Sequence, residues 1–166
     1  IKCIVRLIEP DAGALTVLGE NCTKLDNNEL NALRKKIGFL FQSAALYDSM
    51  TVRENLEFPL RVSPLMKEKE KNELVNEALE NVGLLEAIDK KPSELSGGMR
   101  KRIGLARTLI LKPEIMLYDE PTTGLDPITS KEVSHLIMDV RKKYNTSSII
   151  ISHDICLLYT SDAADE

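Results

Sequence analysis

The chain has 166 residues, of which 43% are hydrophobic and 29% are charged, a composition typical of a globular domain with a sizeable core. Its net charge of −4 includes three acidic residues among the last five, so the sequence lacks the basic excess of a nucleic-acid-binding protein. No apolar run approaches the roughly 18 residues of a membrane span, and the three cysteines lack metal-ligand spacing and are expected to be reduced thiols.

The first part of the chain is predicted to alternate between helices and strands. In chain order, its apolar residues predict a helix at 1–8, a strand at 15–19, a helix at 27–36 and a buried strand at 37–41. Pro10 is expected to end the first helix. Gln42 follows the second strand directly and is a polar residue at the end of a buried element.

The middle of the chain is predicted to be helical. Thr51 and Glu54 form a capping box that opens a short helix, which Pro59 closes. Residues 66–82 carry a periodic apolar face, which predicts a helix that Gly83 ends. The run of lysines and glutamates near its start predicts solvated first turns.

The last part of the chain returns to alternating helices and strands. A helix after Ser96 is expected to stop at Pro113, and a buried strand follows at 115–118. Asp126, with a proline after it, fits the N-cap of a further helix, and a last buried strand is predicted at 148–152. The whole pattern predicts an α/β core with a parallel sheet around a helical insert.

Two carboxylates come directly after the strand at 115–118. Asp119 and Glu120 could bind a metal ion and serve as a general base at this strand end. The alternative is a buried strand followed by a capping aspartate, a combination that is common by chance.

A glycine-rich stretch opens the helix after Ser96. It reads Leu95-Ser96-Gly97-Gly98-Met99, so free backbone N–H groups at a helix N-terminus can face an anion. The alternative is an ordinary loop–helix junction in which Ser96 is the N-cap. The helix dipole disfavours cations in a first turn, so we expect phosphates or acidic partners near Arg100, Lys101 and Arg102.

The stretch at 95–99, the strand ending in Asp119-Glu120 and the extension at 121–126, in this order, resemble the ATP-binding cassette of ABC transporters. The resemblance covers residues 1–155. It implies an α/β fold, a partial P-loop NTPase (RecA-like) core with a parallel sheet, and an α-helical ABC subdomain at about 43–105. ATP and Mg²⁺ are the cofactors that it implies.

The resemblance also implies roles for four residues at strand ends. Asp119 would bind Mg²⁺, and Glu120 would act on the attacking water as general base. Gln42 would touch both Mg²⁺ and the water, and His153 would contact the γ-phosphate. Read alone, Gln42 also fits a strand cap and His153 a structural histidine.

A composite nucleotide site follows from the same resemblance. In the family, the signature stretch, to which 95–99 corresponds, binds the γ-phosphate held by the second ATPase subunit of a head-to-tail dimer. The extension at 121–126 resembles the D-loop, which contacts the facing subunit. The nucleotide-binding residues implied here are Gln42, Leu95, Ser96, Gly97, Gly98, Met99 and Asp126.

Two features narrow the resemblance. Met99 stands where most members have glutamine, and together with residues 41–60 it looks like the Mla/Mce-type ATPases, which move phospholipids or other hydrophobic compounds between bacterial membranes. This likeness implies a cytoplasmic ATPase subunit, peripheral on the inner face of the bacterial inner membrane, that works with transmembrane permease subunits. It also allows an Mce-type lipid-binding protein as a partner.

Two parts of the chain depart from the family pattern. The phosphate loop G-x-x-x-x-G-K-[ST] is absent from all 166 residues. Our hypothesis is therefore an N-terminally truncated fragment, itself inactive, whose Walker A region lies upstream of Ile1. Residues 156–166 show neither helical nor strand periodicity and are interpreted as a non-native tail.

Two other functions compete with that of a transporter ATPase. A soluble ABC ATPase outside transport would usually carry tandem cassettes or long coiled-coil insertions, and neither is visible in this sequence. A degenerate cassette that only dimerises is opposed by Glu120 and His153, because degenerate sites often lose one or both of these groups.

Overall fold

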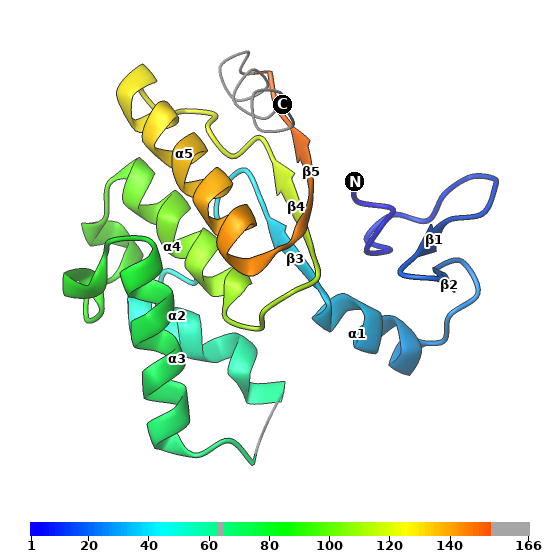
Figure 1. The fold of residues 1–166 in the computed structure, drawn as a ribbon, viewed down its shortest axis with the longest axis horizontal. Coiled ribbons are helices and arrows are strands. Elements are labelled where there is room, and N and C mark those ends of the chain that lie inside the picture. The colour runs from blue at the N-terminus through cyan, green and yellow to red at the C-terminus, as the bar shows by residue number, and fades with distance from the viewer. Residues whose placement is uncertain (63–64, 154–166) are drawn as a thin grey trace.

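A three-stranded parallel sheet forms the centre of the molecule (Figure 1) in the computed structural model, which describes residues 1–62 and 65–153. Its strands are β3 (Ile37–Leu40), β4 (Ile115–Asp119) and β5 (Ser147–Ile151), in the order β3-β4-β5. Leu40 lies beside Tyr118, and Tyr118 lies beside Ile150. The predicted α/β fold with a parallel sheet is therefore confirmed.

Five α-helices and a small hairpin surround this sheet in the described part of the chain. The helices are α1 (Asn27–Lys35), α2 (Val52–Glu57), α3 (Glu68–Asn81), α4 (Gly97–Leu109) and α5 (Pro127–Tyr144). Short 3-10 helices are η1 (Phe58–Val62), η2 (Leu85–Ala87) and η3 (Pro92–Glu94), and the antiparallel hairpin is β1 (Thr16–Val17) with β2 (Glu20–Asn21). Thr51 and Asp126 are N-caps as predicted. None of the described helices has the length and apolar character needed to cross a membrane.

The two faces of the sheet are covered by different parts of the chain. Successive side chains of a strand point to opposite faces, so Tyr118 and Leu117 enter separate cores. Tyr118 packs with Leu105 of α4 and Ile137 of α5. Leu117 packs with Leu33 of α1 and with the N-terminal segment.

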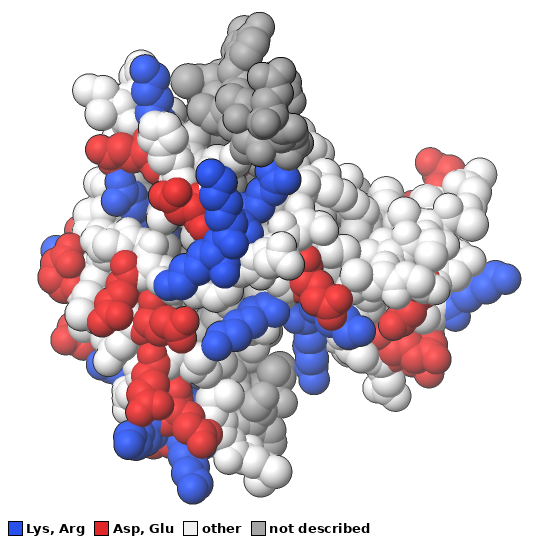
Figure 2. All heavy atoms as spheres, viewed as in Figure 1, with Lys and Arg blue, Asp and Glu red and all other residues white. Residues whose placement is uncertain are grey.

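A further core lies among α2, α3 and α4, away from α1 (Figure 1). Leu56, Leu79 and Ile103, one from each helix, are almost completely buried there. The outer side of α3 carries mixed charges, as Figure 2 shows over this part of the surface, with an ion pair between Lys69 and Glu73. The predicted solvated first turns of this helix are therefore confirmed.

Residues 1–8 form hydrogen-bonded turns, so the predicted helix there is wrong. The Ile4 amide donates to the Ile1 carbonyl at 3.0 Å, and the Arg6 amide donates to the Cys3 carbonyl at 3.0 Å. Arg6 has φ +48°, a left-handed conformation that a right-handed helix cannot include. The Leu7 amide donates to the Lys2 carbonyl at 3.0 Å, so these hydrogen bonds do not follow the i→i−4 pattern of an α-helix.

β5 is more exposed than the predicted buried strand. Ile149 and Ile151 retain 46% and 39% of their surface, although both are large apolar side chains. The reason is that β5 lies at the edge of the described sheet, and the N-terminal segment packs over Leu117 of β4 on that face. The length and position of the strand agree with the prediction.

Two predictions about domain organisation are not decided by this fold. The division into a cassette at 1–155 and a helical subdomain at about 43–105 remains a prediction. The interpretation of residues 156–166 as a non-native tail lies outside the described residues.

Candidate functional site

Three strand ends bring the predicted polar residues to one edge of the sheet. Asp119 ends β4, Gln42 follows β3 by two residues, and His153 follows β5 by two residues. The strands are parallel, so their carboxyl ends meet at the same edge, where α/β proteins commonly bind ligands. The structure thus places these sequence-predicted residues on neighbouring strands.

Glu120 and His153 are in direct contact at this edge. The carboxylate Oε1 of Glu120 lies 2.6 Å from Nδ1 of His153, and its Oε2 accepts a 3.3 Å hydrogen bond from the His153 backbone N–H. The backbone of Glu120 is anchored as well, because its N–H donates to the Ile151 carbonyl at 2.8 Å. Two residues that the sequence predicted separately are therefore parts of one polar pair.

Thr123 supports the same carboxylate. Its hydroxyl donates to Oε2 of Glu120 at 2.9 Å. This hydrogen bond is the main reason why the pKa of Glu120 is lowered, and the contacts with His153 lower that pKa further. Glu120 is thereby held as a carboxylate, the form that a general base requires. Sequence reasoning did not single out Thr123, although its place three residues after Glu120 in a turn could have suggested the contact.

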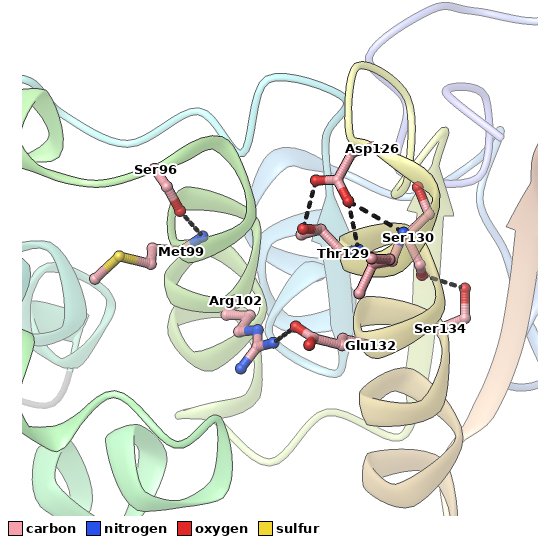
Figure 3. Close-up of polar contacts among 9 residues, drawn as sticks. Ser96, Met99, Arg102, Asp126, Thr129, Ser130, Glu132 and Ser134 are labelled. Carbon is pink, nitrogen blue, oxygen red and sulfur yellow. Dashed lines mark hydrogen bonds and ion pairs between the residues drawn. The ribbon is translucent and has the colours of Figure 1, made fainter.

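The stretch at 95–99 is a capped helix start in the structure. Figure 3 shows the Ser96 hydroxyl accepting from the Met99 backbone N–H, at 3.2 Å. The N-cap role considered for Ser96 is therefore present. Leu95 and the Met99 side chain pack into the core among α2, α3 and α4. Gly97 and Gly98, as the first two helical residues, keep N–H groups without an intrahelical acceptor.

The two glycines also allow a close approach within the chain. A Cβ on Gly98 would lie 2.4 Å from Cγ2 of Thr129, and one on Gly97 would lie 3.3 Å from Cδ2 of Leu125. The start of α4 thus packs tightly against the segment that leads into α5. At Gly98, this packing is a structural reason for glycine besides the approach of an anion.

Asp126 performs the predicted capping role at the start of α5. Its carboxylate accepts from the backbone N–H groups of Ile128 and Thr129, at 3.1 and 3.0 Å, and from the Thr129 hydroxyl at 2.6 Å (Figure 3). The Thr129 hydroxyl is the main cause of the lowered pKa of Asp126. Its implied contact with a facing subunit or nucleotide stays a prediction.

The three cations of the first turn of α4 all have acceptors within the chain. Arg100 donates to the Leu95 carbonyl at 2.9 Å, and Arg102 pairs with Glu132 of α5 (Figure 3). The expectation of an acidic partner is therefore met for Arg102. Lys101 differs from that expectation, because it is buried and donates to backbone carbonyls.

A cavity of about 300 Å³ lies where these segments converge. It is bounded by the loop after β3, the start of α4 and the loop after Glu120, through residues that include Gln42, Gly97, Lys101 and Thr123. The cavity joins parts of the chain that the sequence assigned to separate motifs.

The oxygen donors at the sheet edge fit a magnesium ion whose remaining ligands are phosphate oxygens and water. No group of three or more His, Cys, Asp or Glu side chains suited to a metal occurs among residues 1–62 and 65–153. Mg²⁺ is usually bound by one or two carboxylates together with substrate phosphates and water. The Asp119 carboxylate and the Gln42 amide are oxygen donors at adjacent strand ends.

Solved structures with the same fold define the class. A dimeric ATP-binding cassette, MJ0796, in a post-hydrolysis state with ADP and Pi, has a TM-score of 0.83 and 31% identity over 94% of this chain and 69% of that one. The cassette cbiO1 from Clostridium perfringens, part of the transporter complex cbiONQ, has a TM-score of 0.83 and 28% identity over 93% of this chain and 61% of that one. The fold is thus that of an ATP-binding cassette.

The sequence comparison gives the family. Residues 1–123 match the sequence model of the ABC transporter family, and the chain belongs to that family. A probable ribonucleotide transport ATP-binding protein, mkl, from Mycobacterium leprae is 40% identical over 96% of this chain and 46% of its own length. The methionine import ATP-binding protein MetN from Bifidobacterium longum is 40% identical over 93% of this chain and 38% of its own length. The chain spans less than half the length of these relatives.

Proposed function

We propose that this chain is part of the ATP-hydrolysing subunit of an ABC transporter. The observation that carries the proposal is the Glu120 carboxylate, held 2.6 Å from His153 at the sheet edge that also bears Asp119 and Gln42. A general base, an imidazole and oxygen donors for a metal are groups that can serve the hydrolysis of the γ-phosphoanhydride bond of ATP by water.

In the proposed mechanism, Glu120 orients the attacking water and accepts its proton. The lowered pKa keeps this carboxylate ionised near neutral pH. His153 faces Glu120 through Nδ1, so its ring can orient the water or contact the γ-phosphate. Asp119 and Gln42 would hold Mg²⁺, which supplies positive charge beside the phosphates when it is bound.

The start of α4 would serve a nucleotide held by a second ATPase subunit. The free N–H groups of Gly97 and Gly98 and the positive end of the helix dipole favour a phosphate group there. The similar cassette MJ0796 is dimeric in its solved structure, which supports a dimeric arrangement for this chain too. Leu95 and Met99 would shape this site through packing.

The proposed setting is the cytoplasmic face of the bacterial inner membrane. A translocation path would come from separate transmembrane permease subunits, as in other members of the ABC transporter family. The family match supports this partnership, as does the similar cassette cbiO1, which is part of a transporter complex.

For the transported substrate we propose phospholipid or another hydrophobic compound, with an Mce-type protein as a further partner. The support is Met99 in the signature and the likeness of residues 41–60 to that branch. The similar proteins mkl and MetN are named for ribonucleotide transport and methionine import, so ribonucleotide and methionine are the competing candidate substrates. Uptake by the full-length protein with its permease in vesicles, measured for lipid, methionine and ribonucleotide, decides among them.

ATP hydrolysis by the full-length protein tests the proposed activity. We expect Mg²⁺-dependent hydrolysis, and E120Q should lower kcat by a factor of about 10²–10⁴, the usual contribution of a general base. ATP binding by this variant should stay within about threefold of wild type, because the amide preserves the shape of the side chain. Wild-type protein without hydrolysis, or E120Q with full activity, would contradict the proposal.

A further inference from the structure

Lys101 is a buried lysine that joins two loops of the candidate site. Only 6% of its surface is exposed. Its Nζ donates to the backbone carbonyl of Gln42 at 2.5 Å and to the backbone carbonyl of Glu120 at 3.2 Å. Both acceptors belong to residues of the proposed hydrolytic site, and they lie on two different strand ends.

Burying an amine is costly, so this position needs a physical reason. Burial lowers the pKa of Lys101, and the negative charge of Glu120 opposes that shift. An apolar side chain of similar length would avoid the cost of desolvating an amine. An apolar side chain has no hydrogen-bond donor for the carbonyls of Gln42 and Glu120. Lysine has one that reaches both, and this explains its presence at position 101.

The surrounding face of α4 also holds the loop after Gln42. A Cβ on Gly104 would lie 2.9 Å from the Cβ of Ala44, so the glycine makes room for the loop. Arg107 donates to the carbonyls of Ala44 and Ala45 at 3.0 and 2.8 Å. These two alanines have φ +61° and +47°, a costly conformation that neighbouring contacts must maintain.

We propose that Lys101 is a positioning residue for ATP hydrolysis, which fixes the backbones of Gln42 and Glu120 to the helix that begins at the signature stretch. The inference rests on the proposed function and extends it. The backbone N–H groups of Gly97 and Gly98, at the start of the same helix, would bind the phosphate of a facing nucleotide. Lys101 lies one turn further along this helix, so the contact with a facing nucleotide and the position of the base depend on one rigid element.

K101M in the full-length protein is the central test. It keeps the length of the side chain and removes the donor. The matched control is R102M, which removes the neighbouring cation of α4, whose partner Glu132 lies on α5 outside both loops. K101R keeps hydrogen-bond donors at this position and should restore much of the activity that K101M loses. Where K101M does not fold, K101Q gives the same comparison, because its shorter amide cannot reach both carbonyls.

Three measurements are made on each variant: kcat, KM for ATP, and hydrogen exchange of the backbone amides at 42–45 and at Glu120, Thr122 and Thr123. For K101M we expect kcat to fall at least about tenfold with KM within about threefold, since a small displacement of a catalytic group is costly. Amide exchange in both loops should rise about tenfold or more. R102M should keep kcat and exchange near wild type, and K101R should recover at least about a third of kcat.

The outcomes separate this inference from the proposed function. K101M with wild-type kcat and unchanged exchange would overturn the inference while leaving the ATPase proposal intact. Equal losses in K101M and R102M would also overturn it, because they would reflect general weakening of α4. If the wild-type protein hydrolyses no ATP, the proposed function fails, and the exchange of the two loops alone decides whether Lys101 fixes them.

Discussion

The backbone of Glu120 determines where its carboxylate points. Its φ of +50° is a left-handed conformation, which costs roughly 1–3 kcal/mol in a residue other than glycine. The hydrogen bond to Ile151, the Lys101 contact and the side-chain contacts with Thr123 and His153 maintain this conformation. At the scale of single residues, contacts with neighbouring residues therefore hold Glu120 in its left-handed conformation.

T123V tests how the carboxylate is held. Valine has nearly the shape of threonine but removes the hydroxyl that lowers the pKa of Glu120. We expect the pKa of Glu120 to rise, so the acid side of the kcat–pH profile of the full-length protein should move to higher pH. The value of kcat at neutral pH should fall by about ten- to a hundredfold, because a hydrogen bond of about 1.5–3 kcal/mol to the charged carboxylate no longer holds it in place.

T123S is the control for that experiment, because serine keeps a hydroxyl at the same place. Its pH profile should match wild type. A T123V profile that coincides with the wild-type profile would mean that the hydroxyl does not determine the pKa of Glu120.

Since the lowered pKa belongs to the folded state, the stability that Glu120 contributes is present above its ordinary pKa and is lost as pH falls through the lowered value.

Asn55 fixes the loop before α2 from inside the protein. Its side chain is completely buried. The amide Oδ1 accepts from the Tyr47 N–H at 2.8 Å, and Nδ2 lies within hydrogen-bond distance of the carbonyls of Tyr47, Met50 and Thr51. One side chain thereby satisfies several backbone groups of the segment at 47–51.

N55L should therefore destabilise the protein strongly. Leucine has a similar volume but leaves buried backbone groups without partners, at a cost of about 2–4 kcal/mol. Denaturant unfolding monitored by circular dichroism measures the change. N76A, on the exposed side of α3, should change stability by less than about 0.5 kcal/mol, and a similar loss in both variants would contradict the role given to Asn55.

At the scale of elements, α4 connects most of the molecule. Its side chains enter both the core shared with α2 and α3 and the core under the sheet, through Ile103 and Leu105 respectively. Its first turn meets the segment leading into α5, where Gly98 lies against Thr129. One helix therefore links the signature stretch to the sheet edge.

G98A tests this close contact between α4 and α5. The added methyl group would lie 2.4 Å from Cγ2 of Thr129, so either the Thr129 side chain or the start of α4 must shift. We expect a loss of about 1–3 kcal/mol in the free energy of unfolding, typical of overpacking.

The double variant G98A/T129S provides the control. Serine lacks Cγ2 but keeps the hydroxyl that donates to Asp126. It should recover most of the stability lost in G98A. If the double variant is no more stable than G98A, the loss has another cause, such as the altered backbone at the helix start.

At the scale of the whole molecule, the described structure contains the sheet edge proposed for hydrolysis and the helix that begins at the signature stretch, but no phosphate loop. The motif G-x-x-x-x-G-K-[ST], whose backbone N–H groups and lysine hold phosphates, occurs nowhere in the 166 residues. Glu120 and the start of α4 act on nucleotide phosphates in our proposal, and neither holds ATP by itself.

We therefore expect these 166 residues to bind ATP very weakly, with a Kd above about 1 mM in isothermal titration with Mg²⁺. The full-length protein serves as the positive control. Micromolar affinity for the 166-residue chain would refute the expectation and would mean that another part of this chain holds the nucleotide.

Apart from the helix expected at 1–8, the sequence by itself determined the order of the main helices and sheet strands, the parallel sheet and the residues at its carboxyl edge, because hydrophobic periodicity, capping residues and strand ends are local signals. It placed Asp119, Glu120 and His153 correctly at the ends of β4 and β5. Only the tertiary structure decided that Lys101 reaches the carbonyls of Gln42 and Glu120, and that β5 stays partly exposed. Contacts between residues far apart in the chain depend on how helices pack on the sheet, and no local pattern encodes that packing.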